Sequence, residues 1–212
     1  MRPTLKLERR FIAQGQRLIA GIDEAGRGAW AGPVVAAAVI LPLDRPRLTA
    51  ALKGVNDSKK LTARQREKLY AVICEVAVSV GVGGAGPGEI DAGGIVPATR
   101  AAMQRAIAML HPQPDALFID AVNLSSLFSL PQRSLNHGDS LSLSIAAASI
   151  IAKVSRDRLM AKLDALHPGY NFARHKGYGT ALHKAALEQL GISEAHRRSY
   201  GPIQKLIRQL GL

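Results

Sequence analysis

The stretch Gly21-Ile22-Asp23-Glu24-Ala25-Gly26-Arg27-Gly28 decides how the fold of this chain can be interpreted. A short apolar run ends in two adjacent acids, and a glycine-rich turn with one arginine follows them. The acids favour a divalent metal, because crowded carboxylates raise one another's pKa unless a cation compensates them. The glycines allow the backbone to lie close to a ligand, and the arginine suits a phosphate or a carboxylate.

The segments around this stretch predict a mixed sheet. We expect a strand over residues 18–22 that ends at Asp23, and the apolar run 34–41 predicts a second, central strand. The link between these two strands is too short for a crossover helix, so they should pair as a hairpin. Residues 116–119 predict another buried strand, which again ends in an acid, Asp120.

Helical patterns follow the early strands. Thr62 and Gln65 have the spacing of a capping box at the start of a helix. Residues 78–82 predict a third strand, which the glycines at its end should interrupt. A long helix is expected over residues 143–166, and its small residues 146–149 would let it lie close to a neighbour. This order predicts an α/β fold, with a mixed sheet flanked by helices.

The length of 212 residues and the 47% of apolar residues are enough for one domain with a substantial core. We expect a single catalytic domain over residues 1–212. It would have a core at about 18–166 and a helical, basic C-terminal extension at about 167–212.

The formal net charge of +12 favours nucleic acid as a partner, although a basic surface also serves solubility. The single cysteine, Cys74, excludes an intrachain disulfide and fits a reducing, cytoplasmic setting. The first 20 residues lack the apolar segment of a secretory signal. The longest apolar runs are too short to span a bilayer, so no membrane association is expected.

Four acids, Asp23, Glu24, Asp120 and Asp139, lie at the predicted ends of strands or before a helix. Strand ends can converge on one edge of a mixed sheet, where a divalent cation would compensate the carboxylates. Carboxylate ligation selects Mg²⁺ or Mn²⁺ over zinc. Two such ions about 3.5–4 Å apart catalyse phosphodiester displacement. Each acid could also be an ordinary turn residue, and Asp139 could equally be a helix N-cap.

Asp23 and Glu24 pose a geometric problem, because neighbours in a strand point to opposite faces. Both can serve one metal only if the strand ends or bends between them. The flanking Gly21 and Gly26 would permit such a departure, and we favour Asp23 as the central ligand.

The combination of motifs resembles the ribonuclease HII family, the type 2 ribonucleases H. The similarity extends in order from about residue 18 to residue 203. Beyond the opening stretch it includes Asp57-Ser58-Lys59-Lys60-Leu61, Gly138-Asp139, residues 146–154, Arg156-Asp157, residues 175–180 and His196-Arg197-Arg198-Ser199.

The resemblance implies a ribonuclease H-like fold and a Mg²⁺- or Mn²⁺-dependent endonuclease. Such an enzyme cleaves the RNA strand of RNA·DNA hybrids and single ribonucleotides embedded in duplex DNA, leaving 3′-hydroxyl and 5′-phosphate ends. The four carboxylates of the family match Asp23, Glu24, Asp120 and Asp139. The turn Gly26-Arg27-Gly28 matches the element that senses the 2′-hydroxyl, and Tyr178 matches the tyrosine that stacks on the sugar at the RNA–DNA junction.

Basic residues in the matching segments are candidates for contacts with the phosphate backbone, which position a substrate without specifying its sequence. They are Lys59, Lys60, Lys176, Arg197 and Arg198, and each could instead be a solvated surface charge. Some positions depart from the family pattern, among them two next to the matched acids. Ala121 replaces the usual glycine after Asp120, and His137 replaces a lysine, which would weaken one phosphate contact or make it pH-sensitive.

Three other classes of protein were weighed against this interpretation. Ribonuclease HIII has an additional N-terminal domain, for which about 20 residues before the motif leave no room. A non-catalytic RNA-binding protein would explain the charge but not the four acids. A phosphate-loop protein would need a Gly-Lys-Ser/Thr ending after the glycine turn. We expect a monomer, with a replication clamp or a polymerase as a possible protein partner.

Overall fold

The computed structural model describes residues 2–211, apart from the side chain of Leu210. Its centre is a five-stranded sheet in the order β3-β2-β1-β4-β5. Strand β1 pairs antiparallel with β2 and parallel with β4, so the sheet is mixed as predicted. The strands are β1 (Ile19–Ala25), β2 (Val34–Ile40), β3 (Ser79–Ala85), β4 (Ala116–Asp120) and β5 (Gln132–Leu135).

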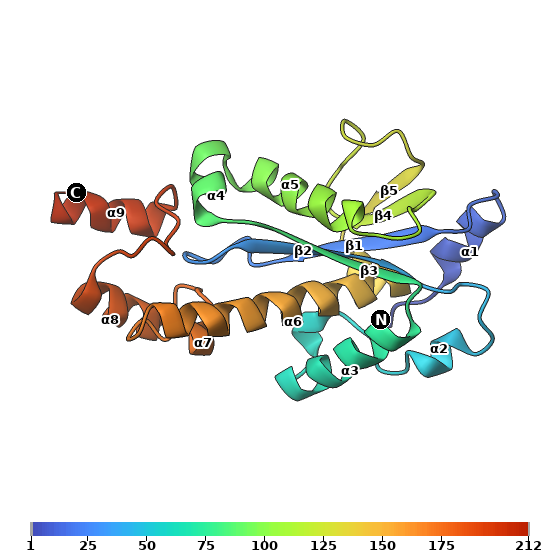
Figure 1. Ribbon diagram of the computed structural model, residues 1–212, viewed down its shortest axis with the longest axis horizontal. Helices are drawn as coiled ribbons and strands as arrows, with labels where there is room; N and C mark the ends of the chain where they lie inside the picture. The colour runs from blue at the N-terminus through green and yellow to red at the C-terminus, as the bar shows by residue number, and fades with distance from the viewer. Residues whose placement is uncertain (1, 212) are drawn as a thin grey trace.

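Helices cover both faces of the sheet (Figure 1). Helix α5 (Ile95–Ala108) lies on one face, and the long α6 (Leu143–Leu166) lies on the other and continues towards the C-terminal helices. The remaining helices are α1 (Lys6–Ile12), α2 (Leu48–Ala51), α3 (Ala63–Val76), α4 (Pro87–Gly93), α7 (Phe172–His175), α8 (Ala181–Leu190) and α9 (Gly201–Leu210), with short 3-10 turns η1 (Ser58–Lys60) and η2 (Gly138–Ser140).

Two layers of apolar side chains hold the sheet between its helices. One layer, which includes Val39, Ile73 and Ile151, packs against α3 and α6. The other, which includes Ile22 and Met103, packs against α5. All seven positions of β2 are buried, which confirms that this apolar run is a central strand.

Glycines let the helices approach the sheet closely. A Cβ at Gly21 would lie 2.1 Å from the carbonyl carbon of Ser144, so α6 contacts the backbone of β1 directly. In β3, a Cβ at Gly81 would lie 2.0 Å from the Ala106 carbonyl oxygen of α5, and Gly83 is similarly crowded. The prediction that glycines interrupt this strand is therefore wrong, because they are the positions on which α5 packs.

Helix caps agree with the sequence at one position and differ at another. Thr62 accepts a hydrogen bond from the Gln65 backbone and the Gln65 side chain accepts one from Thr62, which confirms the capping box. The N-cap of α6 is Ser142, whose hydroxyl accepts from the Ile145 backbone at 3.2 Å. Asp139 lies in η2 and is not the cap of this helix, so its carboxylate is available for another role.

The C-terminal helices α7, α8 and α9 form a cluster of their own against the far half of α6. Phe172, Leu187 and Ile203 pack there with Met160 and with Ala31 from the loop between β1 and β2. Figure 1 shows these helices at one end of the long axis, where they enclose the tip of the β1–β2 hairpin. The helical C-terminal region expected from the sequence is therefore present.

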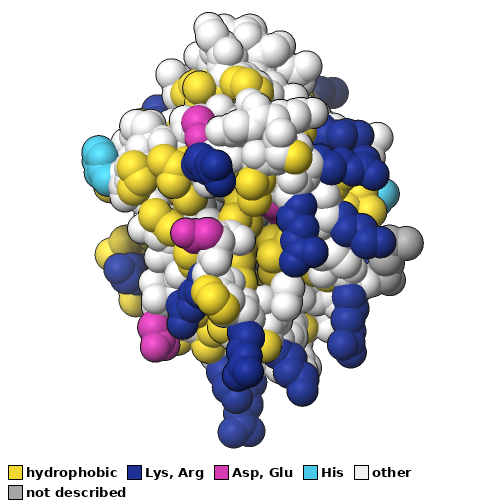
Figure 2. All heavy atoms as spheres, turned by 90° about the vertical axis from the view of Figure 1, so that its right-hand side faces the viewer, with side chains coloured by type: hydrophobic (Ala, Val, Ile, Leu, Met, Phe, Trp, Pro, Cys, Tyr) yellow, Lys and Arg dark blue, Asp and Glu magenta, His cyan; other side chains and the backbone are white. Residues whose placement is uncertain are grey.

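Basic side chains predominate on the opposite end of the molecule. Figure 2 shows this end, near α1, with many Lys and Arg side chains and few acids. Within residues 2–211, no helix is long and apolar enough to cross a membrane.

Candidate active site

Strand register brings two of the predicted acids together. Ile22 of β1 is the parallel neighbour of Ile119 in β4, so the next residues, Asp23 and Asp120, lie side by side on adjacent strands. Asp120 Oδ1 accepts a hydrogen bond from the backbone of Gly138 at 2.7 Å. This bond brings Asp139 to the same edge of the sheet, so three chain segments contribute to one carboxylate cluster.

Asp23 and Glu24 both lie inside a regular strand. Strand β1 pairs with β2 through Ala25, with Asp23 opposite Ala37 and Glu24 opposite Ala36. The prediction that the strand ends at Asp23 is wrong, because β2 supplies backbone partners beyond that point. Alternation places Asp23 on the α6 face, like Gly21, and directs Glu24 to the other face.

Burial and the charges of neighbouring acids shift the pKa values of three carboxyls in this cluster. Burial raises the pKa of Asp23 well above its ordinary value, and the charges of Glu24 and Asp120 raise it further. Burial also raises the pKa of Glu24, with Arg27 opposing the shift. Burial raises the pKa of Asp139 to about 6, and the charges of Asp57 and Asp120 contribute to the shift. Asp120 acts on all three of its partners, so the four acids form one electrostatic unit.

The chemistry of this cluster fits a divalent cation. The atoms that it offers to a metal are all carboxylate oxygens, and Glu24 Oε2 is buried without a hydrogen-bond partner. Within residues 2–211, no three His, Cys, Asp or Glu side chains are already grouped as the ligands of one ion, so these carboxylates would have to draw together to share it. A cation would remove the mutual repulsion that raises their pKa values.

Two residues outside the predicted set also belong to this region. Asp57 caps η1 by accepting from the Lys59 backbone at 2.9 Å, and its charge acts on Asp139. The hydroxyl of Ser149, on α6, donates to that of Ser58 at 2.9 Å, and Ser149 lies near enough to Asp23 to lower the pKa of that carboxyl. The only sequence signal for them was their place in the segments that resemble the family.

The turn Gly26-Arg27-Gly28 follows the carboxylates immediately. Gly26 has φ +95°, and a Cβ there would lie 1.9 Å from Nε of Arg156. The Arg27 side chain is 40% exposed, and its Nη1 lies 3.4 Å from Glu24 Oε1. Gly28 faces open space. The turn therefore presents an arginine and an open backbone beside the cluster.

Tyr178 lies next to this turn. Its side chain is 37% exposed, and its ring centroid is 5.5 Å from the guanidinium carbon of Arg156. The backbone of Trp30 donates to the Gly177 carbonyl at 2.8 Å, which joins the tyrosine loop to the segment after the glycine turn. The structure therefore brings the two predicted recognition elements together.

The predicted basic contacts occupy different environments. Lys59 and Lys60 are exposed on η1, and Lys60 Nζ lies 3.2 Å from the Ser140 hydroxyl. The charge of Lys59 lowers the pKa of both Glu24 and Asp139, so this lysine faces the cluster. Lys176 is partly buried beside Tyr178 and adopts φ +55°.

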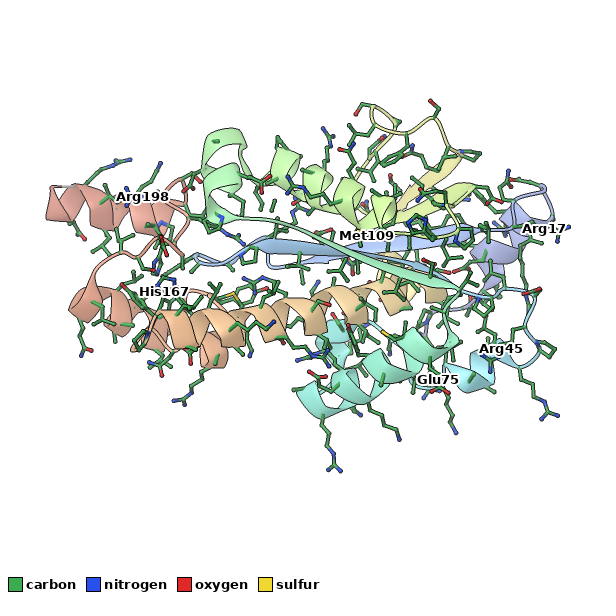
Figure 3. All side chains as sticks on the ribbon, viewed as in Figure 1. Arg17, Arg45, Glu75, Met109, His167 and Arg198 are labelled. Carbon is green, nitrogen blue, oxygen red and sulfur yellow. The ribbon has the colours of Figure 1, made fainter. Side chains whose placement is uncertain are left out.

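Arg197 and Arg198 differ sharply from each other. Arg197 is fully buried and donates to the carbonyls of Gly32 at 2.9 Å and Arg27 at 2.8 Å. This burial corrects the expectation of a phosphate contact, because the guanidinium is used to hold the glycine turn. Arg198 is exposed, and its backbone donates to Asp91 Oδ2 at 2.9 Å. Figure 3 places it near α9, at the opposite end of the long axis from Arg17 and Arg45.

Comparison with known proteins identifies relatives over nearly the whole chain. The family model described as ribonuclease HII matches residues 20–202. The chain is 55% identical over 210 residues to a protein from Chloroflexus aurantiacus named ribonuclease HII, covering 99% of each chain.

Three solved structures share this fold. Ribonuclease H2 from Pyrococcus horikoshii has a TM-score of 0.75 and 26% identity, covering 91% of this chain and 98% of that one. Ribonuclease HII from Archaeoglobus fulgidus, solved in a complex with PCNA, has a TM-score of 0.73 and 28% identity, covering 86% and 95%. Bst-RNase HIII in complex with Mn²⁺ shares the fold, with a TM-score of 0.68 at 21% identity, covering 91% and 70%.

Proposed function

Because this chain belongs to the ribonuclease HII family and is therefore an endoribonuclease acting on RNA–DNA hybrids, we propose that Asp23, Glu24, Asp120 and Asp139 form its active site. The observation that carries this proposal is the parallel register of β1 and β4, which sets Asp23 beside Asp120. The hydrogen bond from Gly138 to Asp120 then brings in Asp139. These acids come from distant segments, and neither hydrophobic packing nor helix capping explains why they lie close together.

The activity depends on a divalent metal, which these four carboxylates would hold. When bound, a divalent cation supplies an activated water and stabilises the leaving oxygen in phosphodiester hydrolysis. Asp23 and Asp120 would be the central ligands and Asp139 would join them from η2, whereas Glu24, on the other face of β1, would be a more peripheral ligand. Lys59 offsets part of their negative charge. We propose Mg²⁺ or Mn²⁺ as the ion, since both accept carboxylate ligands.

The turn Gly26-Arg27-Gly28 and Tyr178 would recognise the substrate. The 2′-hydroxyl distinguishes RNA from DNA at the cut site, and an open glycine backbone can approach it. The partly exposed Tyr178 ring offers a surface for stacking on the neighbouring sugar. We therefore propose cleavage at single ribonucleotides in duplex DNA as well as in hybrids, with 3′-hydroxyl and 5′-phosphate products.

Lys59, Lys60, Lys176 and Arg198 are proposed to contact the phosphate backbone. This assignment rests on their exposed or partly exposed side chains and on the net charge of +12. We further propose that the chain is a single domain, acts in the cytoplasm as a monomer, and docks on a sliding clamp. The clamp proposal is supported by the Archaeoglobus fulgidus relative that was solved with PCNA.

Replacing the central acids tests the active site. Asp120→Asn and Asp23→Asn should abolish metal-dependent cleavage of an RNA–DNA hybrid while hybrid binding, measured by fluorescence anisotropy, stays close to wild type. Asp44→Asn, at an exposed acid outside the cluster, is the matched control and should cleave normally. Full activity of Asp120→Asn would refute the assignment.

A further inference from the structure

Arg156 is a buried cation in the middle of α6. Its side chain is fully buried. Its guanidinium donates through Nε to the Pro33 carbonyl at 2.9 Å, through Nη1 to the Lys176 carbonyl at 2.9 Å, and through Nη2 to the Ala31 carbonyl at 3.2 Å. One side chain therefore binds the segment that follows the glycine turn and the segment that precedes Tyr178.

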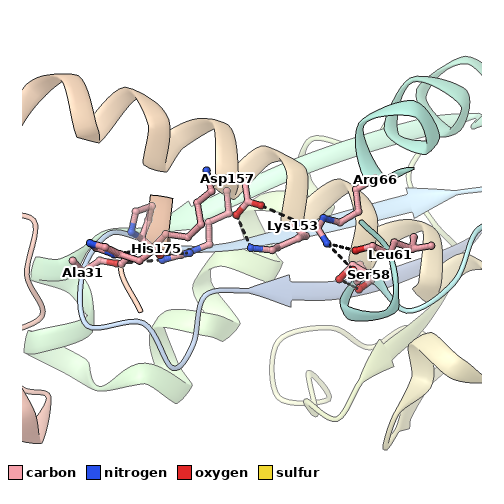
Figure 4. Close-up of polar contacts among 12 residues, drawn as sticks. Ala31, Ser58, Leu61, Arg66, Lys153, Asp157 and His175 are labelled. Atoms are coloured by element: carbon pink, nitrogen blue, oxygen red, sulfur yellow. Dashed lines mark hydrogen bonds and ion pairs between the residues drawn. The ribbon is translucent and has the colours of Figure 1, made fainter. Parts of the chain in front are cut away.

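The same guanidinium also contacts both recognition elements. It lies directly against Gly26, where a Cβ would come within 1.9 Å of Nε. It lies under the Tyr178 ring, with 5.5 Å between the guanidinium carbon and the ring centroid. Figure 4 shows the row of polar contacts along this part of α6, from Ser58 and Leu61 to Ala31 and His175.

No carboxylate within residues 2–211 forms an ion pair with Arg156. Burial lowers its pKa to about 10, so it remains protonated at neutral pH. A buried cation is strongly destabilising unless hydrogen bonds replace its water. The carbonyls of Ala31, Pro33 and Lys176 provide those bonds, so moving either segment away would leave the charge unsolvated.

We propose that Arg156 is a positioning residue for ribonucleotide recognition, which fixes the Gly26–Gly28 turn and Tyr178 at the spacing that one ribose requires. The inference rests on the function proposed above for these two elements. Arg156 itself would touch neither substrate nor metal. Its loss should therefore affect the choice of substrate more than the chemistry at the carboxylates.

The test compares two substrates, a duplex DNA with one embedded ribonucleotide and a hybrid with an all-RNA strand. In Arg156→Met, we expect kcat/KM for the single ribonucleotide to fall about 10- to 100-fold relative to the hybrid, as expected when recognition groups are slightly misplaced. Arg156→Lys keeps the charge and should recover part of the loss. Arg158→Met is the matched control on the same helix, because Arg158 is half exposed and pairs with Glu67.

The fluorescence of Trp30 provides a measurement that does not depend on cleavage activity. Trp30 is the only tryptophan of the chain, and its ring packs on Gly179, where a Cβ would lie 2.0 Å from the indole. Its fluorescence therefore reports the contact between the two segments that Arg156 joins. In Arg156→Met, the emission should shift to the red and acrylamide should quench it more strongly, with neither change in Arg158→Met.

A double-mutant cycle with Tyr178→Ala keeps the proposal falsifiable even if Arg156→Met does not fold. The selective loss caused by Arg156→Lys should largely disappear when Tyr178 is already absent. Equal losses on both substrates, full additivity in the cycle, or an unchanged substrate ratio would each overturn the proposal. Failure of the proposed function would look different, because wild-type protein would then not cleave the single-ribonucleotide duplex.

Discussion

The pair His183 and His196 should make the C-terminal region sensitive to acid. Both side chains are buried, and their Nε2 atoms lie 3.0 Å apart. The Ser193 backbone N–H donates to His196 Nδ1 at 3.1 Å, which favours the tautomer whose proton lies on Nε2 and is donated to His183. His183 then donates through Nδ1 to the Tyr178 carbonyl at 3.0 Å. In this arrangement of bonds, both imidazoles are neutral.

Burial lowers the pKa of each histidine from 6.5 to about 4. Below pH 6.5 the unfolded chain therefore binds protons that the folded chain does not bind. As a result, the free energy of unfolding falls as the pH drops from 6.5 towards 4. At pH 5, linkage from these pKa values gives about 2 kcal/mol of lost stability per histidine. That is a large part of the 5–15 kcal/mol typical of a folded domain.

Urea denaturation at pH 7.5 and pH 5.0 measures this loss. Wild type should lose about 2 kcal/mol more than His196→Gln between the two conditions. The raised pKa of Asp139 acts in the opposite direction, because the folded state gains stability as that acid is protonated, but it is common to both proteins and cancels. His111→Gln, at an exposed histidine, should keep the wild-type dependence. Equal losses in wild type and His196→Gln would refute the reasoning.

Other substitutions have equally defined outcomes. Tyr178→Ala should weaken transition-state binding of a single-ribonucleotide duplex by about 1–3 kcal/mol, and unchanged kcat/KM there would mean a structural role. Gly21→Ala should lower the free energy of unfolding in urea by about 1–3 kcal/mol or more, because the new methyl group would overlap Ser144. A free energy of unfolding equal to that of wild type would instead show that α6 can move away. Lys59→Ala should reduce the slope of log affinity against log salt for a hybrid by about 0.7–0.9, and an identical slope would exclude a phosphate contact.

Much of the fold was predictable because its signals are local. The apolar run of β2, the capping box at Thr62 and the extent of α6 each depend on neighbouring residues, and the structure confirms them. The end of β1 was not predictable in this way. Whether pairing continues through Ala25 depends on partner residues of β2, and the sequence of one strand does not contain that information.

The sequence best predicted which acids lie together where residue type and strand position agreed. Asp23 and Asp120 each follow an apolar run, and parallel pairing brings them together. The prediction for Arg197 assumed an exposed side chain, because charged side chains are almost always exposed. Its burial depends on carbonyls from Arg27 and Gly32, far away in sequence, which only the tertiary structure brings near.

Helix α6 would explain how the proposed cutting and recognition residues can lie next to each other, at the end of β1 and in the turn that follows it. Ser149 lies near Asp23 and lowers the pKa of its carboxyl, whereas Arg156 contacts the glycine turn and Tyr178. Seven residues separate them, so they lie on the same face of the helix, about 10.5 Å apart along its axis. The crowding of Ser144 on Gly21 fixes that face against β1. The spacing between the carboxylates and the proposed ribose-recognition elements would therefore be set by one helix, to which Arg156 ties the segment that follows the turn.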